Sequence, residues 1–239
     1  MEKDLNKNLI HNQNSKIISV LREIVFGVED GIISTLGVLI GIAAGTNERF
    51  VVIISGIVVI VVESISMGVG SYLSAKSVRE VDKNKLEEEE TEIKEFSEKE
   101  KRELFEMYIK DGWSEDLANR MVSESSRNKK LFLTEMAHRE LHVYPEKLDN
   151  PLRGGIIMLL SYVVGGTIPL LPYFFLPIST AILFSIALAS LGLFILGSIT
   201  TKFTKRHWLK AGVEMVLMAG LAALVGYFVG LLANYFFKV

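Results

Sequence analysis

Apolar and polar residues are strongly segregated along the 239-residue chain. Long apolar segments are expected near residues 18–45, 50–75, 153–173, 177–201 and 209–237. Each is long enough to cross a hydrocarbon layer as a helix, which takes roughly 20 residues. The pattern therefore predicts an all-α integral membrane protein with five transmembrane helices.

Charged residues gather in the segment between the second and the third apolar stretch. We divide the chain accordingly: 1–75 holds an N-terminal tail and transmembrane helices 1 and 2, 76–150 a polar domain, and 151–239 transmembrane helices 3 to 5. Short connections are predicted at Gly45–Arg49 and Pro169–Pro177. Neither connection is long enough to hold a further domain.

The polar segment is itself predicted to be helical, because Glu, Lys, Leu and Met dominate it and Gly is nearly absent. Three helices are expected: an extension of the second span to about residue 95, one near 98–111, and one near 115–143. A break of the last helix around Arg127–Asn128 is left open. Ser97 followed by Glu100 predicts a capping box for the middle helix.

Positive charges give the expected orientation. Basic residues lie in the N-terminal tail and in the connection before the fifth span: Lys3, Lys7, Lys16, Arg22, Lys202, Lys205, Arg206 and Lys210. By the positive-inside rule both segments are cytosolic, so the 76–150 insert is cytosolic too. The first fifteen residues are too polar for a signal peptide. The Lys-rich composition favours a prokaryotic cell membrane, with a vacuolar membrane as the alternative.

The chain contains no cysteine. This excludes disulfides, thiolate metal sites and cysteine nucleophiles together. Any metal ion must therefore be bound through oxygen, nitrogen or thioether ligands.

The first predicted span contains two acidic residues, Glu23 near its start and Asp30 further inside. Glu23 and Asp30 share a helical face with small residues, namely Gly27, Ser34, Gly37 and Gly41. Close packing against another helix explains the small residues. It does not explain Asp30, because an acid two turns inside an apolar span costs a few kcal/mol. Asp30, with Glu23, is therefore a candidate for an ion pathway.

The second span repeats the pattern with Glu63 and Met67, which are four residues apart and share a face. A carboxylate with a thioether suits a transition metal such as Fe(II) better than Mg or Ca, which prefer oxygen alone. Methionine in a membrane helix is usually a packing residue, so its value as a ligand depends on Glu63.

The polar segment offers paired carboxylates: Glu89 and Glu92, then Glu100 and Glu103. Most glutamates here fit a solvated, salt-bridged helix face, since lysines are interleaved with them. Pairs three residues apart on two packed helices would instead form an oxygen-rich metal site. Met136 and Glu140 share a face further on. His138 and His142 are expected at the surface, because the HRELH run lacks the HExxH zinc pattern.

Three stretches carry a family resemblance: IVFGVEDGIISTLGVLIG (24–41), ISMGVGSYLSAKS (65–77) and LSYVVGGTIPLLPYFF (160–175). They resemble the vacuolar iron transporter family, in the same order over nearly the whole chain. The resemblance implies a homodimer that exchanges cytosolic Fe(II) or Mn(II) for protons along a path at the dimer interface. It implies pathway roles for Asp30 and Met67. It also implies a cytosolic metal site made of Glu89, Glu92, Glu100, Glu103, Met136 and Glu140.

Two positions depart from the family pattern. Val59 stands where family members carry a second-span glutamate, and Glu63 lies one turn further along the same face. Ala137 replaces a second methionine, which weakens the expected preference for a soft metal.

We therefore predict a transporter that moves Fe(II), or another divalent metal such as Mn(II), out of the cytosol by proton antiport. It is expected to be neither an enzyme nor a nucleic-acid binder, and to hold no prosthetic group. A membrane-anchored carboxylate-bridged iron oxidase or storage protein is the alternative, although Glu135 and His138 are its only Glu-x-x-His pair. A sensor or scaffold would leave the acids inside the spans without a purpose.

Overall fold

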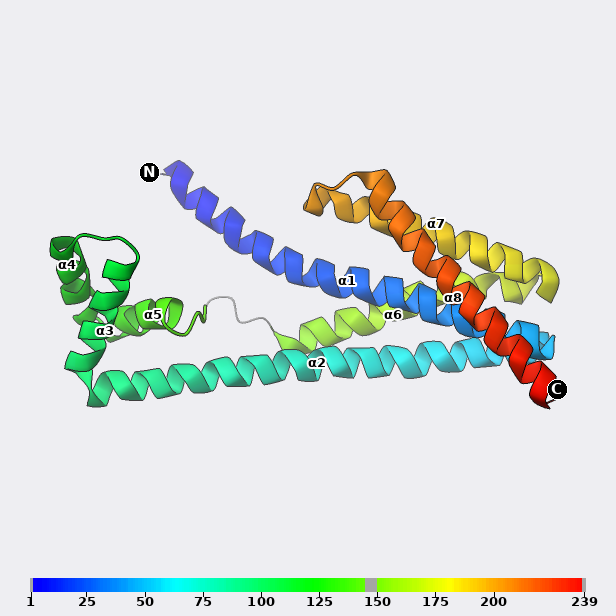
Figure 1. Cartoon of the computed structure of the whole chain (residues 1–239), viewed down its shortest axis with the longest axis horizontal. Coiled ribbons are helices and arrows are strands. Elements are labelled where there is room, and N and C mark those ends of the chain that lie inside the picture. Colours follow the sequence, from blue (N-terminus) through cyan, green and yellow to red (C-terminus); the bar gives the residue numbers. More distant parts are fainter. Residues whose placement is uncertain (1, 145–149, 238–239) are drawn as a thin grey trace. The chain divides into compact units, whose positions relative to one another are not determined.

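The computed structural model describes residues 2–144 and 150–237, with side chains described for 20–144 and 150–236. Every regular element within these ranges is a helix (Figure 1). The side chains of Lys3, Lys7 and Lys16, and the end of the polar segment at 145–149, lie outside the described residues.

The elements are α1 (Glu2–Thr46), α2 (Arg49–Glu95), α3 (Ser97–Lys110), α4 (Glu115–Ser126), α5 (Lys129–Arg139), α6 (Pro151–Phe175), α7 (Ile178–Thr204) and α8 (Trp208–Phe237). The chain divides into two compact units. The membrane unit comprises residues 1–73 and 151–239, and the polar unit comprises residues 74–150. Helix α2 begins in the membrane unit and ends in the polar unit without interruption.

Among the described residues, five helices are long and apolar enough to cross a membrane, and they coincide with the five predicted apolar segments. Their bounds differ from the prediction in two places. Helix α1 begins at Glu2, so the predicted polar tail is helical. Helix α6 runs through Pro169 and Pro172 to Phe175, where a connection was expected.

Side chains from outside α6 donate hydrogen bonds to carbonyls in its last turns. Ser185 on α7 donates a hydrogen bond of 2.7 Å from Oγ to the Pro169 carbonyl. Arg49 donates from Nε to the Tyr173 carbonyl at 2.7 Å, and from Nη2 to the Phe174 carbonyl. Each proline inside α6 leaves the carbonyl four residues earlier without its helical donor, a loss that packed membrane helices tolerate. The true boundary is Pro177, which precedes α7.

Small residues let the helices of the membrane unit approach closely. A Cβ atom added to Gly31 would lie 2.5 Å from the Tyr162 carbonyl oxygen of α6. One added to Gly41 would lie 2.9 Å from the Gly226 carbonyl oxygen of α8, which runs across α1 in Figure 1. The small-residue face of the first span is therefore a packing face, as expected for close membrane-helix contacts.

The polar unit is built on one hydrophobic cluster beside α2. Buried residues from four helices form it: Ile93, Leu104, Tyr108, Ala118, Val122, Phe132 and Met136. The expected third helix is broken, as the open alternative allowed, because Asn128 caps α5 by accepting from Lys130 N and Leu131 N at 3.0 and 3.3 Å. Helix α5 ends at Arg139 rather than at 143.

The predicted capping box is wrong. Helix α3 begins at Ser97 itself, and Phe96 is the N-cap residue, with no side-chain cap hydrogen bond. Glu100 does not reach back to the helix start, because its side chain is buried and only 1% exposed. Its carboxylate belongs to the site described below.

Replacing Gly31 by Ala is expected to destabilise the membrane unit, because the new methyl group would overlap the backbone of α6. Overpacking of this kind costs about 1–3 kcal/mol. The measurement is the melting temperature of the purified chain in detergent. Gly220→Ala is the matched control, since a Cβ there meets nothing within 4 Å, and it should not lower the melting temperature. Equal effects of the two substitutions would contradict the packing argument.

Candidate metal-ion sites

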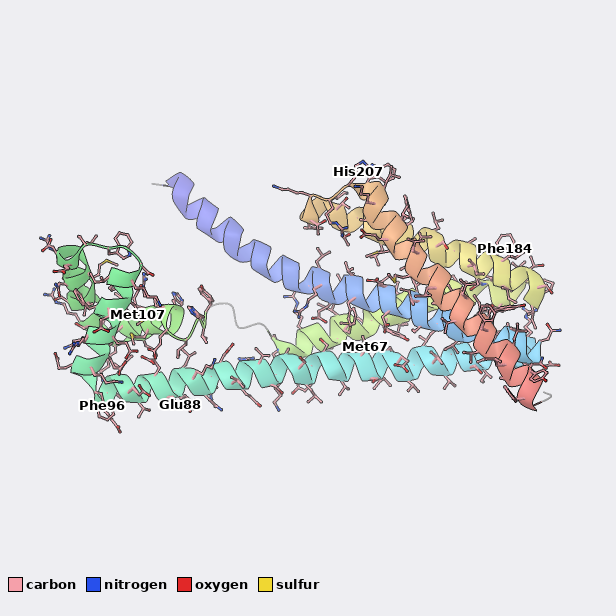
Figure 2. All side chains as sticks on the ribbon, in the orientation of Figure 1. Met67, Glu88, Phe96, Met107, Phe184 and His207 are labelled. Atoms are coloured by element: carbon pink, nitrogen blue, oxygen red, sulfur yellow. The ribbon has the colours of Figure 1, made fainter. Side chains whose placement is uncertain are left out.

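Three carboxylates of the polar unit converge on one point. Glu89 on α2, Glu100 on α3 and Glu140 at the C-cap of α5 each place an oxygen so that all three lie within 4.8 Å of one another. Glu89 is 3% and Glu100 1% exposed, whereas Glu140 is exposed. Figure 2 labels the neighbouring Glu88 on α2 and Met107 on α3. We call Glu89, Glu100 and Glu140 the carboxylate cluster.

Two oxygens of the carboxylate cluster are buried without a partner. Glu89 Oε1 and Glu100 Oε2 accept no hydrogen bond from any described residue. Buried polar atoms are normally paired, because an unsatisfied acceptor costs roughly 1–3 kcal/mol. A divalent cation would satisfy both oxygens, which are ligands of the kind that Mg, Mn and Fe(II) accept.

Electrostatics agree with the geometry. Burial, followed by the charges of Glu140 and Glu100, raises the pKa of Glu89 to about 7, with smaller contributions from Glu92 and Glu103. The pKa of Glu140 is also raised, by desolvation and by the charges of Glu103 and Glu100. Like charges held together in this way favour a bound proton or a bound cation.

The other predicted ligands lie around the cluster rather than in it. Glu92 is exposed and Glu103 half-buried, and neither places an oxygen within the three-carboxylate group, although their charges act on it. Met136 is wholly buried in the hydrophobic cluster of the polar unit. Its role as a thioether ligand stays a prediction.

Lys99 lies beside the cluster and was not singled out by sequence. Its Nζ donates a hydrogen bond of 3.4 Å to Glu100 Oε1 and lies 3.9 Å from Glu103 Oε2. The hydrogen bond and charge of Glu100 raise the pKa of Lys99, with smaller contributions from Glu103 and Glu92. In the sequence this lysine is indistinguishable from its interleaved neighbours.

A polar network fixes α5, and with it Glu140, against α3. The Tyr108 hydroxyl donates to Glu135 Oε2 at 3.0 Å, and Arg139 Nε donates to the same oxygen at 3.2 Å. The Arg139 guanidinium lies 4.4 Å from the Tyr108 ring centroid and also pairs with Asp111, the C-cap of α3. Arg139 directly precedes Glu140, so the network sets where that carboxylate lies.

The two histidines do not form an i, i+4 pair on a helix. Helix α5 ends between them, and His142 has a positive φ of 53°. The His138 ring instead lies against the Tyr144 ring in a tilted arrangement, with ring centroids 5.0 Å apart and an interplanar angle of 34°. Neither belongs to the carboxylate cluster.

In the membrane unit, Asp30 and Glu63 lie near enough for their charges to interact. Tyr162 of α6 was not singled out by the sequence analysis. Its hydroxyl lies 2.5 Å from Ser34 Oγ, and the charges of Asp30 and Glu63 act on it. The signal that could have found it is a tyrosine within an apolar span, whose hydroxyl needs a polar partner.

The other residues predicted for the ion pathway, Glu63, Met67 and Glu23, differ in how exposed they are. Glu63 is exposed on α2, and Met67 on the same helix is partly exposed (Figure 2). Glu23 is buried at 7% exposure and accepts hydrogen bonds from Ser71 Oγ at 3.0 Å and Arg22 Nη2 at 2.8 Å. Glu23 therefore joins α1 to α2, whereas Glu63 has an open side.

Membrane-length helices, acids within them and a carboxylate cluster are typical of a multi-pass membrane protein with candidate sites for a cation. Comparison with known proteins gives the family. The VIT family profile matches residues 21–231, and the chain belongs to the VIT family.

Several relatives share most of their length with this chain. A protein of Tulipa gesneriana named vacuolar iron transporter 1 is 28% identical over 225 residues, covering 92% of this chain and 91% of the relative. A vacuolar iron transporter of Plasmodium falciparum is 32% identical over 220 residues, covering 88% and 81%. One of Toxoplasma gondii is 29% identical over 229 residues, covering 92% and 76%.

Glu89 gives the polar unit a pH-dependent stability. Its pKa of about 7 lies above the ordinary value of 4.5, so the folded state binds an extra proton between these values. That stabilisation is complete below about pH 4.5 and is lost as the pH rises through about 7. Without divalent metal, Glu89→Gln should therefore raise the melting temperature at pH 8 by several degrees and change it little at pH 4.5.

The melting of the polar unit can be followed by Trp113 fluorescence in a Trp208→Phe background, since the chain has 2 tryptophans. Glu88→Gln is the control, because Glu88 is exposed and outside the carboxylate cluster. A Glu89→Gln effect that is the same at both pH values would show that burial of the charge is not the cause.

Proposed function

We propose that this protein transports Fe(II), and by the same chemistry Mn(II), out of the cytosol. The observation that carries the proposal is the pair Asp30 and Glu63, two interacting carboxylates inside membrane-length helices. Ionisable residues inside a membrane are costly and usually belong to an ion pathway. The relatives named vacuolar iron transporters support iron as the ion.

The carboxylate cluster is proposed as the site that captures the metal before transport. Its two unpaired buried oxygens and raised Glu89 pKa favour a divalent cation. Glu92 and Glu103 would increase the local cation concentration through their charge. The cluster holds three carboxylates and no histidine, so it lacks the Glu-x-x-His pairs of di-iron oxidases. Transport requires no covalent chemistry, and the protein is proposed not to be an enzyme.

Within the membrane unit, Asp30, Glu63 and Met67 are proposed to replace part of the metal's hydration shell, with Glu23 at the entrance. An apolar span tolerates neighbouring carboxylates only when a cation or protons neutralise them. Metal and protons then compete for the same oxygens. Proton antiport is the transport cycle that follows from this competition.

Glu63 also argues for a homodimer. It lies on an exposed face of α2 together with apolar residues such as Val62 and Ile65. A carboxylate facing lipid would be strongly unfavourable, whereas a second copy of α2 would cover it. The metal path would then lie between the two copies.

The proposed orientation follows the positive-inside rule. The connection between α7 and α8 is rich in basic residues, namely Lys202, Lys205, Arg206 and Lys210. Arg49 instead lies where α2 begins and α6 ends, which is proposed to be the other side of the membrane. The polar unit would be cytosolic. Both a prokaryotic cell membrane and a vacuolar membrane fit a metal exporter of this orientation.

Asp30→Asn and Glu63→Gln should each reduce metal flux by at least tenfold, because each removes one charge that balances the cation. The assay uses sealed vesicles with the cytosolic face outward, a trapped metal indicator and a trapped pH dye. Wild-type protein should admit Fe(II) or Mn(II) while the lumen loses protons.

Glu214→Gln is the control for that assay, since Glu214 pairs with Arg206 at 2.7 Å on an exposed surface. It should transport normally. Normal flux in both Asp30→Asn and Glu63→Gln would exclude the pathway, and metal flux without proton flux would exclude antiport.

Met67→Leu tests the selectivity of the membrane site. The substitution keeps volume and hydrophobicity, so packing should change little. Fe(II) transport should fall several-fold more than Mn(II) transport, because sulfur contributes little to a hard cation. The same vesicle assay measures both ions. Equal losses for the two metals would identify Met67 as a packing residue.

Cysteine cross-linking tests the dimer, because the natural chain has no cysteine. Ser66→Cys introduces one thiol on the exposed face of α2, one turn from Glu63. Oxidation in the membrane should give a disulfide-linked dimer. Leu183→Cys on α7, at a residue that is 68% exposed, should give none. Similar yields from both positions would point to random collision rather than a dimer through α2.

A further inference from the structure

Lys99 differs from the other lysines that form ion pairs in the described polar unit. The others, Lys76, Lys83, Lys94 and Lys101, each pair with an exposed glutamate outside the carboxylate cluster. Lys99 instead pairs with Glu100, whose side chain is 1% exposed, while its own side chain is 66% exposed. A solvent-exposed cation thus pairs with a buried carboxylate.

The ammonium of Lys99 faces most of the proposed metal ligands. It lies 3.4 Å from Glu100 Oε1 and 3.9 Å from Glu103 Oε2. Its charge also acts on Glu92 and Glu140. A single positive charge therefore neutralises part of a group of acids that would otherwise repel one another.

We propose that Lys99 is the resident cation of the carboxylate cluster, which a divalent metal ion must displace in order to bind. Lys99 is then a specificity-determining residue, because it sets both the affinity for divalent ions and the rejection of monovalent ions. This inference rests on the proposed binding of metal by the cluster.

The physical basis is the difference in charge. A divalent ion brings two charges to the carboxylates and gains more from them than one ammonium does. Potassium brings one charge and competes with an ammonium tethered at a high effective concentration, typically in the millimolar range or above. The exposed stem of Lys99 lets the ammonium swing into water when the metal arrives.

The test is Mn(II) binding to the purified full-length chain in detergent, measured by calorimetry. Lys99→Met and Lys99→Gln should each raise the affinity about three- to tenfold, because the competing charge is gone. Lys99→Arg should stay within about twofold of wild type, since the charge is kept. Lys101→Met is the matched control: it lies two residues away, pairs with Glu98 at 2.7 Å, and should change the affinity less than twofold.

Selectivity is tested by adding potassium or tetramethylammonium chloride at equal ionic strength. Screening is the same for both salts, whereas only potassium is small enough to sit among the carboxylates. Wild type should respond equally to the two salts. Lys99→Met should lose more Mn(II) affinity in potassium than in tetramethylammonium.

The outcomes separate this inference from the function on which it rests. If wild type binds neither Mn(II) nor Fe(II), the proposed capture site itself is wrong. If wild type binds and both neutral variants bind equally or more weakly, with unchanged melting temperatures, Lys99 is not a competing cation. A neutral variant that fails to fold overturns the inference too, because a displaceable lysine cannot be essential to the fold.

Discussion

The free energy of removing carboxylates from water is the constraint on which both units depend. In the membrane unit, Asp30 and Glu63 interact within helices that are otherwise apolar. In the polar unit, Glu89 and Glu100 are almost completely buried. Buried charges persist only when a partner or a function compensates their desolvation. The structure supplies part of that compensation and leaves the remainder to protons or a cation.

Packing contacts in the polar unit fix the helices that carry the carboxylates of the cluster. A core that includes Leu104, Phe132 and Met136 fixes the helices that carry them, and Arg139 with Tyr108 fixes the end of α5. These contacts stabilise the fold without satisfying Glu89 Oε1 or Glu100 Oε2. Rigid packing with unsatisfied acceptors preorganises a site, because the ligands need not move when a cation arrives.

Sequence patterns predicted the five spans because length and hydropathy are local properties that a bilayer imposes directly. They could not predict that α6 continues through Pro169 and Pro172, since packing against other helices, which hydropathy does not describe, decides whether a proline ends a membrane helix. Glu100 shows the same limit. Its spacing from Ser97 fits a capping box, but tertiary packing turns its side chain into the carboxylate cluster.

The sequence also predicted part of the candidate site: it indicated which acidic residues to consider, but not how they are arranged. Helical spacing identified the acidic pairs, and the resemblance pointed to Glu89, Glu100 and Glu140, which the fold brings together. Spacing could not show that Glu92 and Glu103 lie outside that group, because the angle between α2 and α3 decides it. It could not distinguish Lys99 from Lys101 either, since only the fold shows which lysine reaches a buried acid.

The two sets of acids suit different tasks. The carboxylate cluster offers oxygen ligands alone among the groups that converge, and oxygen binds hard divalent ions with little preference between Mn(II) and Fe(II). Met136 is wholly buried in the hydrophobic cluster of the polar unit. Met67 is partly exposed on the helix that carries Glu63, so a thioether is accessible in the membrane unit. Under the proposed function, the polar unit would select divalent over monovalent ions by charge, and the thioether of Met67 in the membrane unit would select between divalent metals.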